Sequence, residues 1–272
     1  MKRENKNIID LLKQHKIDVS KYDETFLSKS LQKRITEINC KSKEEYFLLL
    51  AEDANESELF NNSLNNSYSE FFRNPLTFSV LERIVIPALM LRKKETKRKE
   101  IRIWSAACAA GQESYSLAII LEECINGIDK NYNYRIFATD QCKTQLDEAI
   151  KGKYDLSSLN NMSLKRAKEF FTKQGDSYTI KTALKKNIDY SVFDLFSEKL
   201  LCPPVSIFGD FDIVVCANLL FYYKPEYRKT ILQKATNCMA AGGYLITSES
   251  EREIFINYHY KEVFPQSGIF RV

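Results

Sequence analysis

The chain has 272 residues, of which 44% are hydrophobic, so it can form one large or two modest domains with a buried core. Its 40 basic and 36 acidic residues nearly balance, which argues against a general affinity for nucleic acid. Two histidines and seven cysteines without a CxxC pair disfavour a histidine-rich zinc site and a Ser-His-Asp triad. With neither a signal segment nor a long apolar run, we expect a cytoplasmic protein with reduced thiols, no bound metal and no membrane insertion.

The N-terminal part has the apolar spacing that predicts helices. Hydrophobic residues recur every three or four positions through residues 7–51. We therefore expect an all-helical N-terminal domain over residues 1–66, followed by a linker and connecting helix over residues 67–100. The charged run Arg92–Glu100 is expected to be a solvated loop, with a binding patch as the alternative.

From Ile101 onward, short apolar strands alternate with helices, which predicts a doubly wound, mostly parallel α/β sheet in a domain spanning residues 101–272. The expected strands are Ile101–Ser105, Tyr134–Asp140, Ile188–Asp194, Phe211–Asn218 and Gly243–Glu249, with Ile269–Val272 closing the edge. The expected helices between them are Tyr115–Glu123, Lys143–Ile150 and Pro225–Ala240. Residues 152–187 exceed a plain crossover and predict a small inserted subdomain, with a helix over Ser163–Phe171 and a strand over Ser177–Lys181.

The segment Ile101–Ala118 reads as a strand, a tight loop and a helix that carries Glu113. Every side chain in the loop Ala106–Gly111 is small, so its backbone can approach a ligand closely. The loop has one glycine where the dinucleotide fingerprint has three, which disfavours a pyrophosphate cradle and a nicotinamide cofactor. The pattern predicts that another adenosine-containing cofactor lies against this loop and the helix N-terminus.

Polar residues end several of the predicted strands, at the sheet edge where such folds bind ligands. Asp140 is placed to accept hydrogen bonds from both ribose hydroxyls, or it caps the following helix. Asp194 is placed to accept from an adenine amino group, and Asn218 to hold a substrate or an amino-acid moiety. Either of these two could instead be an ordinary turn residue. Their gathering at one edge predicts a site.

A series of motifs runs through the whole chain: SEFFRNPLTF (Ser69–Phe78), WSAACAAGQESYSLA (Trp104–Ala118), ATD (Ala138–Asp140), CANLLFYY (Cys216–Tyr223), GGYL (Gly242–Leu245) and IFRV (Ile269–Val272). In this order they resemble the chemotaxis receptor methyltransferases, the CheR family. The resemblance implies a Rossmann-like class I methyltransferase that uses S-adenosylmethionine, releases S-adenosylhomocysteine and methylates glutamate side chains on the cytoplasmic part of chemoreceptors. The alternatives are a methyltransferase of this fold acting on another protein or a small molecule, and a cofactor-binding signalling module that has lost activity.

The resemblance also implies which residues form the site. The cofactor-binding residues would be Ser67, Ser69, Arg73, Ala107, Glu113, Asp140, Asp194, Asn218 and Leu219. Asp194 would contact the adenine edge, and Asn218 and Leu219 the amino-acid side. Arg73 and Tyr222 would be catalytic. Arg73 would hold the acceptor carboxylate, with a surface ion pair as the alternative, and Tyr222 would stand near the transferred methyl group, with packing as the alternative.

Three departures from the family motifs concern this site. The usual GEEPYS is GQESYS here, so Gln112 replaces a carboxylate and Ser114 a proline. An Asn/Thr pair is represented by Ser67 and Ser69, and the glycine and histidine of GHSE become Ser248 and Glu249. The missing histidines do not obstruct the expected chemistry, because a glutamate carboxylate with a pKa near ~4.3 is ionised at neutral pH and needs no general base.

Two further features concern partners. Lys29, Lys33 and Arg34 form a basic helix face at positions that the family uses against acidic receptor helices, with solvated charge as the alternative. The insert segment Phe170–Lys181 is shorter than in members that grip a receptor C-terminal pentapeptide. We therefore expect no dependence on such a pentapeptide, and a monomeric protein.

Overall fold

The computed structural model describes residues 2–64, 68–96 and 98–272, which divide into two compact units. The first unit contains the N-terminal residues up to Asn66 together with Leu219–Thr230. The second contains Ser67–Asn218 and Ile231–Val272. The grouping of Leu219–Thr230 with the N-terminal helices is a tertiary property that the strand and helix patterns do not predict.

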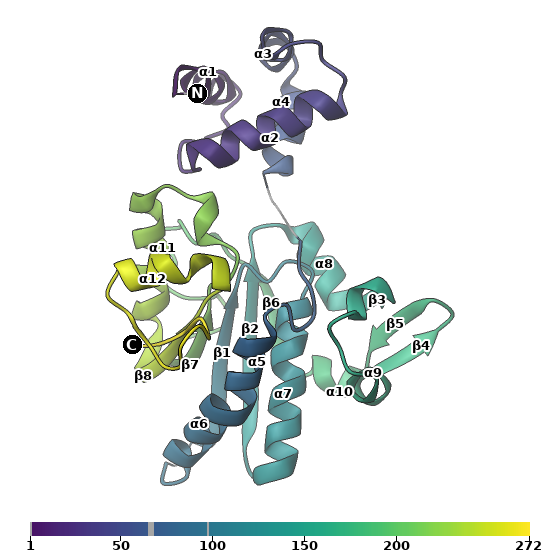
Figure 1. Cartoon of the computed structure of the whole chain (residues 1–272), viewed down its shortest axis with the longest axis vertical. Coiled ribbons are helices and arrows are strands. Elements are labelled where there is room, and N and C mark those ends of the chain that lie inside the picture. Colours follow the sequence, from purple (N-terminus) through teal and green to yellow (C-terminus); the bar gives the residue numbers. More distant parts are fainter. Residues whose placement is uncertain (1, 65–67, 97) are drawn as a thin grey trace. The chain divides into compact units, whose positions relative to one another are not determined.

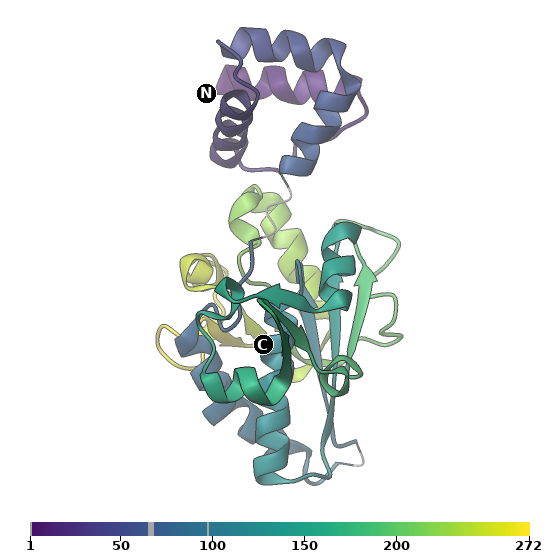
Figure 2. The same cartoon turned by 90° about the vertical axis from the view of Figure 1, so that its right-hand side faces the viewer.

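The first unit is helical at its N-terminal end, as expected. Its helices are α1 (Lys2–Gln14), α2 (Glu24–Glu37), α3 (Lys43–Glu52) and α4 (Ala54–Ser63), grouped at the purple to blue end of the chain (Figure 2). Asp23 starts α2 by accepting hydrogen bonds from the backbone N–H groups of Thr25 and Phe26. The buried side chains of α2 are Leu27, Leu31 and Ile35, spaced by four so that they share one helix face.

The expectation of an exposed basic face on α2 is only partly correct. Arg34 donates through Nε and Nη2 to both carboxylate oxygens of Glu56, each at 2.8 Å. Glu56 is buried and also accepts from the Tyr46 hydroxyl at 2.9 Å. Hydrogen bonding to Arg34 lowers the pKa of Glu56 despite its burial. Arg34 is therefore part of a structural ion pair, whereas Lys29 and Lys33 are exposed.

The segment Leu219–Thr230 is held to the start of α2 within the first unit. The Asp23 N–H donates to the carbonyl of Tyr222 at 2.8 Å, and Tyr22 and Tyr223 form a β-bridge with their rings stacked 5.3 Å apart. The Phe26 ring lies 4.7 Å from that of Tyr222. These backbone and aromatic contacts explain why the segment clusters with the helices.

The second unit is built on a seven-stranded sheet with the order β6-β2-β1-β7-β8-β10-β9. Figure 1 labels its strands β6, β2, β1, β7 and β8. The strands are β1 (Glu100–Ala106), β2 (Asn133–Asp140), β6 (Ile188–Val192), β7 (Phe211–Val215), β8 (Met239–Ile246), β9 (Lys261–Glu262) and β10 (Ile269–Arg271). Strands β6, β2, β1, β7 and β8 are parallel, and β10 and β9 are antiparallel, which confirms the doubly wound, mostly parallel sheet. The expectation that Ile269–Val272 closes the edge is wrong, because β9 pairs with the outer side of β10.

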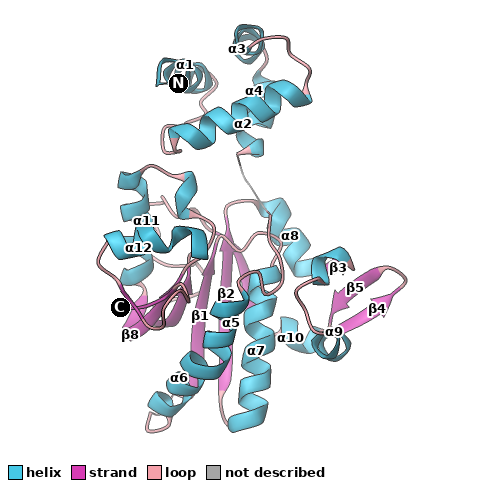
Figure 3. Ribbon diagram, in the orientation of Figure 1, coloured by secondary structure: helices cyan, strands magenta, loops and turns pink. Residues whose placement is uncertain are grey.

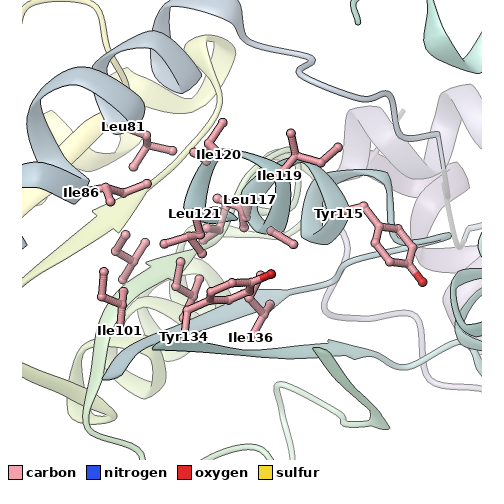
Figure 4. Close-up of a cluster of buried hydrophobic side chains, with 14 of the residues drawn as sticks. Leu81, Ile86, Ile101, Tyr115, Leu117, Ile119, Ile120, Leu121, Tyr134 and Ile136 are labelled. Atoms are coloured by element: carbon pink, nitrogen blue, oxygen red, sulfur yellow. The ribbon is translucent and has the colours of Figure 1, made fainter. Parts of the chain in front are cut away.

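Helices of the second unit bury apolar faces against this sheet. They are α5 (Pro75–Val80), a π-helical turn (Leu81–Val85), α6 (Ile86–Lys93), α7 (Gln112–Ile128), α8 (Lys143–Lys151), α11 (Pro225–Asn237), whose first residues belong to the first unit, and α12 (Arg252–Asn257). Leu117 and Leu121 of α7 pack in one fully buried cluster with Ile101 and Ile136 (Figure 4). This core fixes the N-terminus of α7 beside the end of β1. In the described ranges, we find no helix with the length and apolar character needed to cross a bilayer.

The insert forms a separate antiparallel sheet with the order β3-β5-β4, which stands beside the main sheet in Figure 3. Its strands are β3 (Lys153–Asp155), β4 (Phe171–Gln174) and β5 (Ser177–Ile180), and its helices are α9 (Leu164–Phe170) and the short α10 (Thr182–Lys185). This confirms the inserted β-subdomain. The sequence pattern missed β3 and β4, and it placed Phe171, the first residue of β4, at the end of the expected helix Ser163–Phe171.

The charged run before β1 does not begin as a solvated loop. Arg92 and Lys93 are the last two residues of α6. Both form ion pairs with Asp212, at 3.3 Å for Arg92 and 2.9 Å for Lys93. Asp212 is buried and also accepts from the Arg102 N–H at 2.9 Å. The start of the run is therefore structural, because a buried carboxylate requires such partners.

Candidate functional site

The loop from Ala106 to Gly111 joins β1 to α7 beside the point where the strand order reverses between β1 and β7. Its backbone is left-handed at Ala107 (φ 60°), Ala109 (φ 48°) and Gly111 (φ 87°). A Cβ added at Gly111 would lie 2.8 Å from the Ala149 Cβ, so this position requires glycine. In doubly wound sheets, ligands bind at the carboxyl ends of the strands beside such a reversal.

Asp140 ties this loop to the end of β2. One carboxylate oxygen accepts from the Ala109 N–H at 2.9 Å and the other from the Cys142 N–H at 2.8 Å. Burial raises the pKa of Asp140, and the backbone N–H bonds oppose that rise. Cys142 is the N-cap residue of α8, so the contact with its N–H forms a turn before the helix and does not cap it, while the contact with Ala109 places the carboxylate against the loop.

Glu113 lies in the first turn of α7 and is the end of a short chain of side-chain hydrogen bonds. The Ser105 hydroxyl donates to its carboxylate at 2.7 Å, and the Ser114 hydroxyl donates to that of Ser105 at 3.3 Å. Burial raises the pKa of Glu113 to about 7, although the Ser105 hydrogen bond and the charge of Arg73 both oppose the rise. Ser114, which replaces the family proline, is therefore part of the support of Glu113.

Arg73 shares the electrostatic environment of Glu113, since its charge lowers the pKa of that carboxyl. Its Nη1 donates to the Tyr68 carbonyl at 3.2 Å, and its guanidinium lies 5.3 Å from the Tyr68 ring centroid. The side chain is half-buried, as is that of Ser69. Ser67 lies outside the described residues.

Asn218 follows β7 in a left-handed conformation with φ 57°. Its N–H donates at 2.6 Å to Glu251, a fully buried carboxylate that also accepts from the hydroxyls of Thr247 and Ser248, at 3.0 and 2.8 Å. The sequence interpretation missed Glu251, although its place just after the carboxyl end of β8 was a usable signal. Ser248 supports this carboxylate, whereas Glu249 is exposed.

Other candidates have local partners. Asp194, two residues past β6, is exposed, and its carboxylate accepts a hydrogen bond from the Phe196 N–H at 2.9 Å. This contact agrees with the alternative that Asp194 is an ordinary turn residue. The preceding Phe193 N–H donates to the Asp140 carbonyl at 3.0 Å, so this turn lies next to Asp140. Leu219 and Tyr222 belong to the first unit, where Leu219 is buried and Tyr222 packs on Phe26.

Gln112, which replaces a carboxylate of the family motif, lacks a hydrogen-bond partner among the described residues for its side-chain oxygen. Its side chain is buried, and its Oε1 atom has no hydrogen-bond partner within the described part of the chain. A buried amide oxygen of this kind costs about 1–3 kcal/mol when unpaired. No contact in the structure explains why glutamine stands here.

The family model for the CheR methyltransferase SAM binding domain matches residues 67–268. The chain belongs to the CheR methyltransferase family. Chemotaxis protein methyltransferase of Listeria innocua is 30% identical over 236 residues, covering 87% of this chain and 84% of that protein. Chemotaxis protein methyltransferase 1 of Pseudomonas aeruginosa is 29% identical over 216 residues, covering 78% and 76%. The solved structure of PKMT2 from Rickettsia typhi in complex with AdoHcy has a TM-score of 0.37 at 14% identity, covering 70% of this chain and 29% of that one.

As a CheR family member, the chain is a methyltransferase with a Rossmann-like class I fold, and S-adenosylmethionine is its cofactor. The residues at the sheet edge fit this group. The loop from Ala106 to Gly111 has left-handed backbone at Ala107 and only small side chains, so a ligand can approach its peptide groups closely. Glu113 is a half-buried carboxyl whose ionised form lacks full compensation, and a cationic cofactor would supply the missing charge.

Proposed function

We propose that this CheR protein methylates glutamate side chains on the cytoplasmic segments of chemoreceptors, acting as a monomer in the cytoplasm. The relatives named chemotaxis protein methyltransferase support the chemotactic role. The observation that carries the choice of acceptor is the half-buried Arg73 beside Glu113, because a guanidinium matches a carboxylate with two parallel donors. A carboxylate acceptor also suits a chain with two histidines, since it needs no general base.

All of the proposed cofactor-binding residues except Leu219 belong to the second unit. We propose that Ala107 and its neighbours contact it through the backbone, that Asp140 accepts from ribose hydroxyls, and that Glu113 faces a cationic group. Asp194 would face the adenine edge. The remaining residues proposed to contact the cofactor are Ser67, Ser69, Asn218 and Leu219. Bound S-adenosylmethionine supplies an electrophilic methyl group on its sulfonium. The chain's residues then contribute orientation and the exclusion of water.

The proposed reaction is tested by transfer of a radiolabelled methyl group to receptor cytoplasmic fragments. Label that is released as methanol by mild base supports a glutamate ester. Base-stable label would contradict it and indicate methylation at nitrogen or on another acceptor. An absence of label, in a preparation that binds S-adenosylhomocysteine, would favour a signalling module without activity.

Arg73 is proposed to hold the acceptor carboxylate and also to line the cofactor site. Replacing it with alanine should lower kcat by about hundredfold, because the acceptor is then poorly aligned. Calorimetry with S-adenosylhomocysteine separates the two roles, since an unchanged Kd assigns Arg73 to the acceptor alone. Arg73→Lys keeps the charge but loses the fork, and it should recover only part of kcat. A wild-type kcat in Arg73→Ala would remove Arg73 from the catalytic residues.

Tyr222 stays a candidate for a place near the transferred methyl group. Its contact with Phe26 supports the packing alternative equally. Tyr222→Phe keeps the ring, so an unchanged kcat would exclude a role for the hydroxyl. We also propose that a receptor C-terminal pentapeptide is not required, and calorimetry with such a peptide tests this.

A further inference from the structure

A side chain of the insert contacts the loop from Ala106 to Gly111, which we call the cofactor loop. Tyr154 lies in the middle of β3, and its side chain is buried. Its hydroxyl donates to the carbonyl of Ala110 at 2.7 Å. Ala110 stands between Ala109 and Gly111, both of which have left-handed backbone. The insert therefore fixes the orientation of a peptide group inside the loop.

The same tyrosine ring also packs on the segment that carries Arg73. It lies 4.9 Å from the Phe71 ring in an edge-to-face arrangement, with an interplanar angle of 84°. The ring centroid of Phe171, on β4 of the insert, also lies 5.5 Å from that of Phe71. Phe71 is fully buried, and Arg73 follows two residues later. Two aromatic residues of the insert thus anchor this segment.

A third contact from the insert reaches Phe72. The guanidinium of Arg166, on α9, lies 4.7 Å from the Phe72 ring centroid and pairs with Glu82 at 2.9 Å and with Glu123. Phe72 has a left-handed backbone with φ 51°, and its N–H donates to Ser116 of α7 at 3.0 Å. A strained conformation of this kind persists only where surrounding contacts impose it.

We propose that Tyr154 is a positioning residue that sets the geometry of both the cofactor loop and the Arg73 segment, so that the insert serves the methyl-transfer site of its own chain. This inference rests on the site residues of the proposed function. The loop needs such support because its alanines and glycine have no side chains that could hold its peptide groups. The hydroxyl orders the loop, and the ring orders the segment before Arg73.

Two substitutions separate the contribution of the Tyr154 hydroxyl from that of its ring. Tyr154→Phe removes only the hydroxyl, and the Kd for S-adenosylhomocysteine should rise about three- to tenfold, the effect of one lost hydrogen bond. Its kcat at saturating cofactor should stay within about twofold of wild type, because the ring still supports Phe71. Tyr154→Leu also removes the ring and should lower kcat. The matched control is Tyr178→Phe, which changes the residue paired with Tyr154 on β5 and should keep the wild-type Kd.

The variant Asp140→Ala distinguishes a failure of the positioning role from a failure of the proposed site. If Asp140→Ala loses binding while Tyr154→Phe binds as wild type does, the positioning role is overturned and the proposed site stands. If Asp140→Ala also binds normally, the site assignment fails and the inference falls with it. Hydrogen exchange on the unmodified protein is a second measurement that needs no variant. S-adenosylhomocysteine should protect the amides of Ala107–Gly111 and of β3 together, and protection of the loop alone would contradict the coupling.

Discussion

At the scale of single residues, Glu113 is the group whose protonation should control cofactor affinity. Burial raises its pKa to about 7 in the protein without cofactor. A cationic ligand prefers the ionised carboxylate, so binding should strengthen as the pH rises through 7 and should release a proton near neutrality. Between pH 6 and pH 8 the ionised fraction rises about tenfold, and the Kd for S-adenosylmethionine should fall by about that factor. Calorimetry across this range measures the change.

The matched variant for this prediction is Glu113→Gln, which keeps the shape of the side chain and removes its titration. It should bind weakly and with little pH dependence between pH 6 and 8. A wild-type pH profile in Glu113→Gln would show that another group titrates. Repeating the titration in buffers of different ionisation enthalpy counts the protons released on binding.

The positions that the sequence predicted best are those at the ends of recognisable strands. Asp140 and Asn218 follow apolar runs, and the sheet edge brings their neighbourhoods to one region, as the carboxyl ends of parallel strands must. Ser105, Glu251 and Tyr154 were not predicted, because each acts through a partner on another element. Their roles depend on tertiary contacts such as that between Glu251 and Asn218.

At the scale of elements, α2 offers a narrower basic face than its sequence suggests. Lys29 and Lys33 are exposed, whereas Arg34 is committed to Glu56. We propose that Lys29 and Lys33 attract acidic receptor helices. The double variant Lys29→Glu/Lys33→Glu should then raise the KM for receptor fragments about three- to tenfold, because each reversal would replace an attraction with repulsion. The effect should shrink as salt is added. Steady-state methylation at two ionic strengths provides the measurement.

The control for α2 reverses two exposed lysines of the second unit, Lys94 and Lys130, and so makes the same change in net charge. Equal increases of KM in both double variants would mean that net charge, not α2, attracts the receptor. Arg34 is unsuitable for this test. Its reversal would leave Glu56 buried without its cation, at a cost of about 3–5 kcal/mol in folding stability.

The main parallel strands were predictable, and so were the short strands β5 and β10, whereas β3, β4 and β9 were not. The parallel strands and the helix after β1 were expected because apolar patterns several residues long distinguish strand from helix. The structure extends that helix from the expected Tyr115–Glu123 to Gln112–Ile128, and its first turn carries Glu113, as the strand, loop and helix interpretation expected. β9 has two residues and shows no pattern at all, so the edge of the sheet was assigned to Ile269–Val272 instead.

At the scale of the whole molecule, the chain forms two compact units, but their residues are interleaved. Sequence indicated a helical N-terminal part and an α/β part, because composition and periodicity change along the chain. It could not assign Leu219–Thr230 to the first unit. That assignment depends on contacts with Tyr22 and Asp23, about two hundred positions away, and local patterns carry no information on such pairing.

The division into units predicts where cofactor binding should stabilise the molecule. Trp104 is the single tryptophan, fully buried in β1 of the second unit, so its fluorescence reports the unfolding of that unit. A ligand at a hundred times its Kd adds about 2.7 kcal/mol to the stability of the unit that binds it. For a unit of this size, S-adenosylhomocysteine should raise the midpoint of the fluorescence transition by about 5–10 °C. Asp140→Ala should abolish the shift, since its loop loses the carboxylate that accepts from Ala109. A shift that persists in Asp140→Ala would place the cofactor elsewhere in the molecule and would contradict the site proposed here.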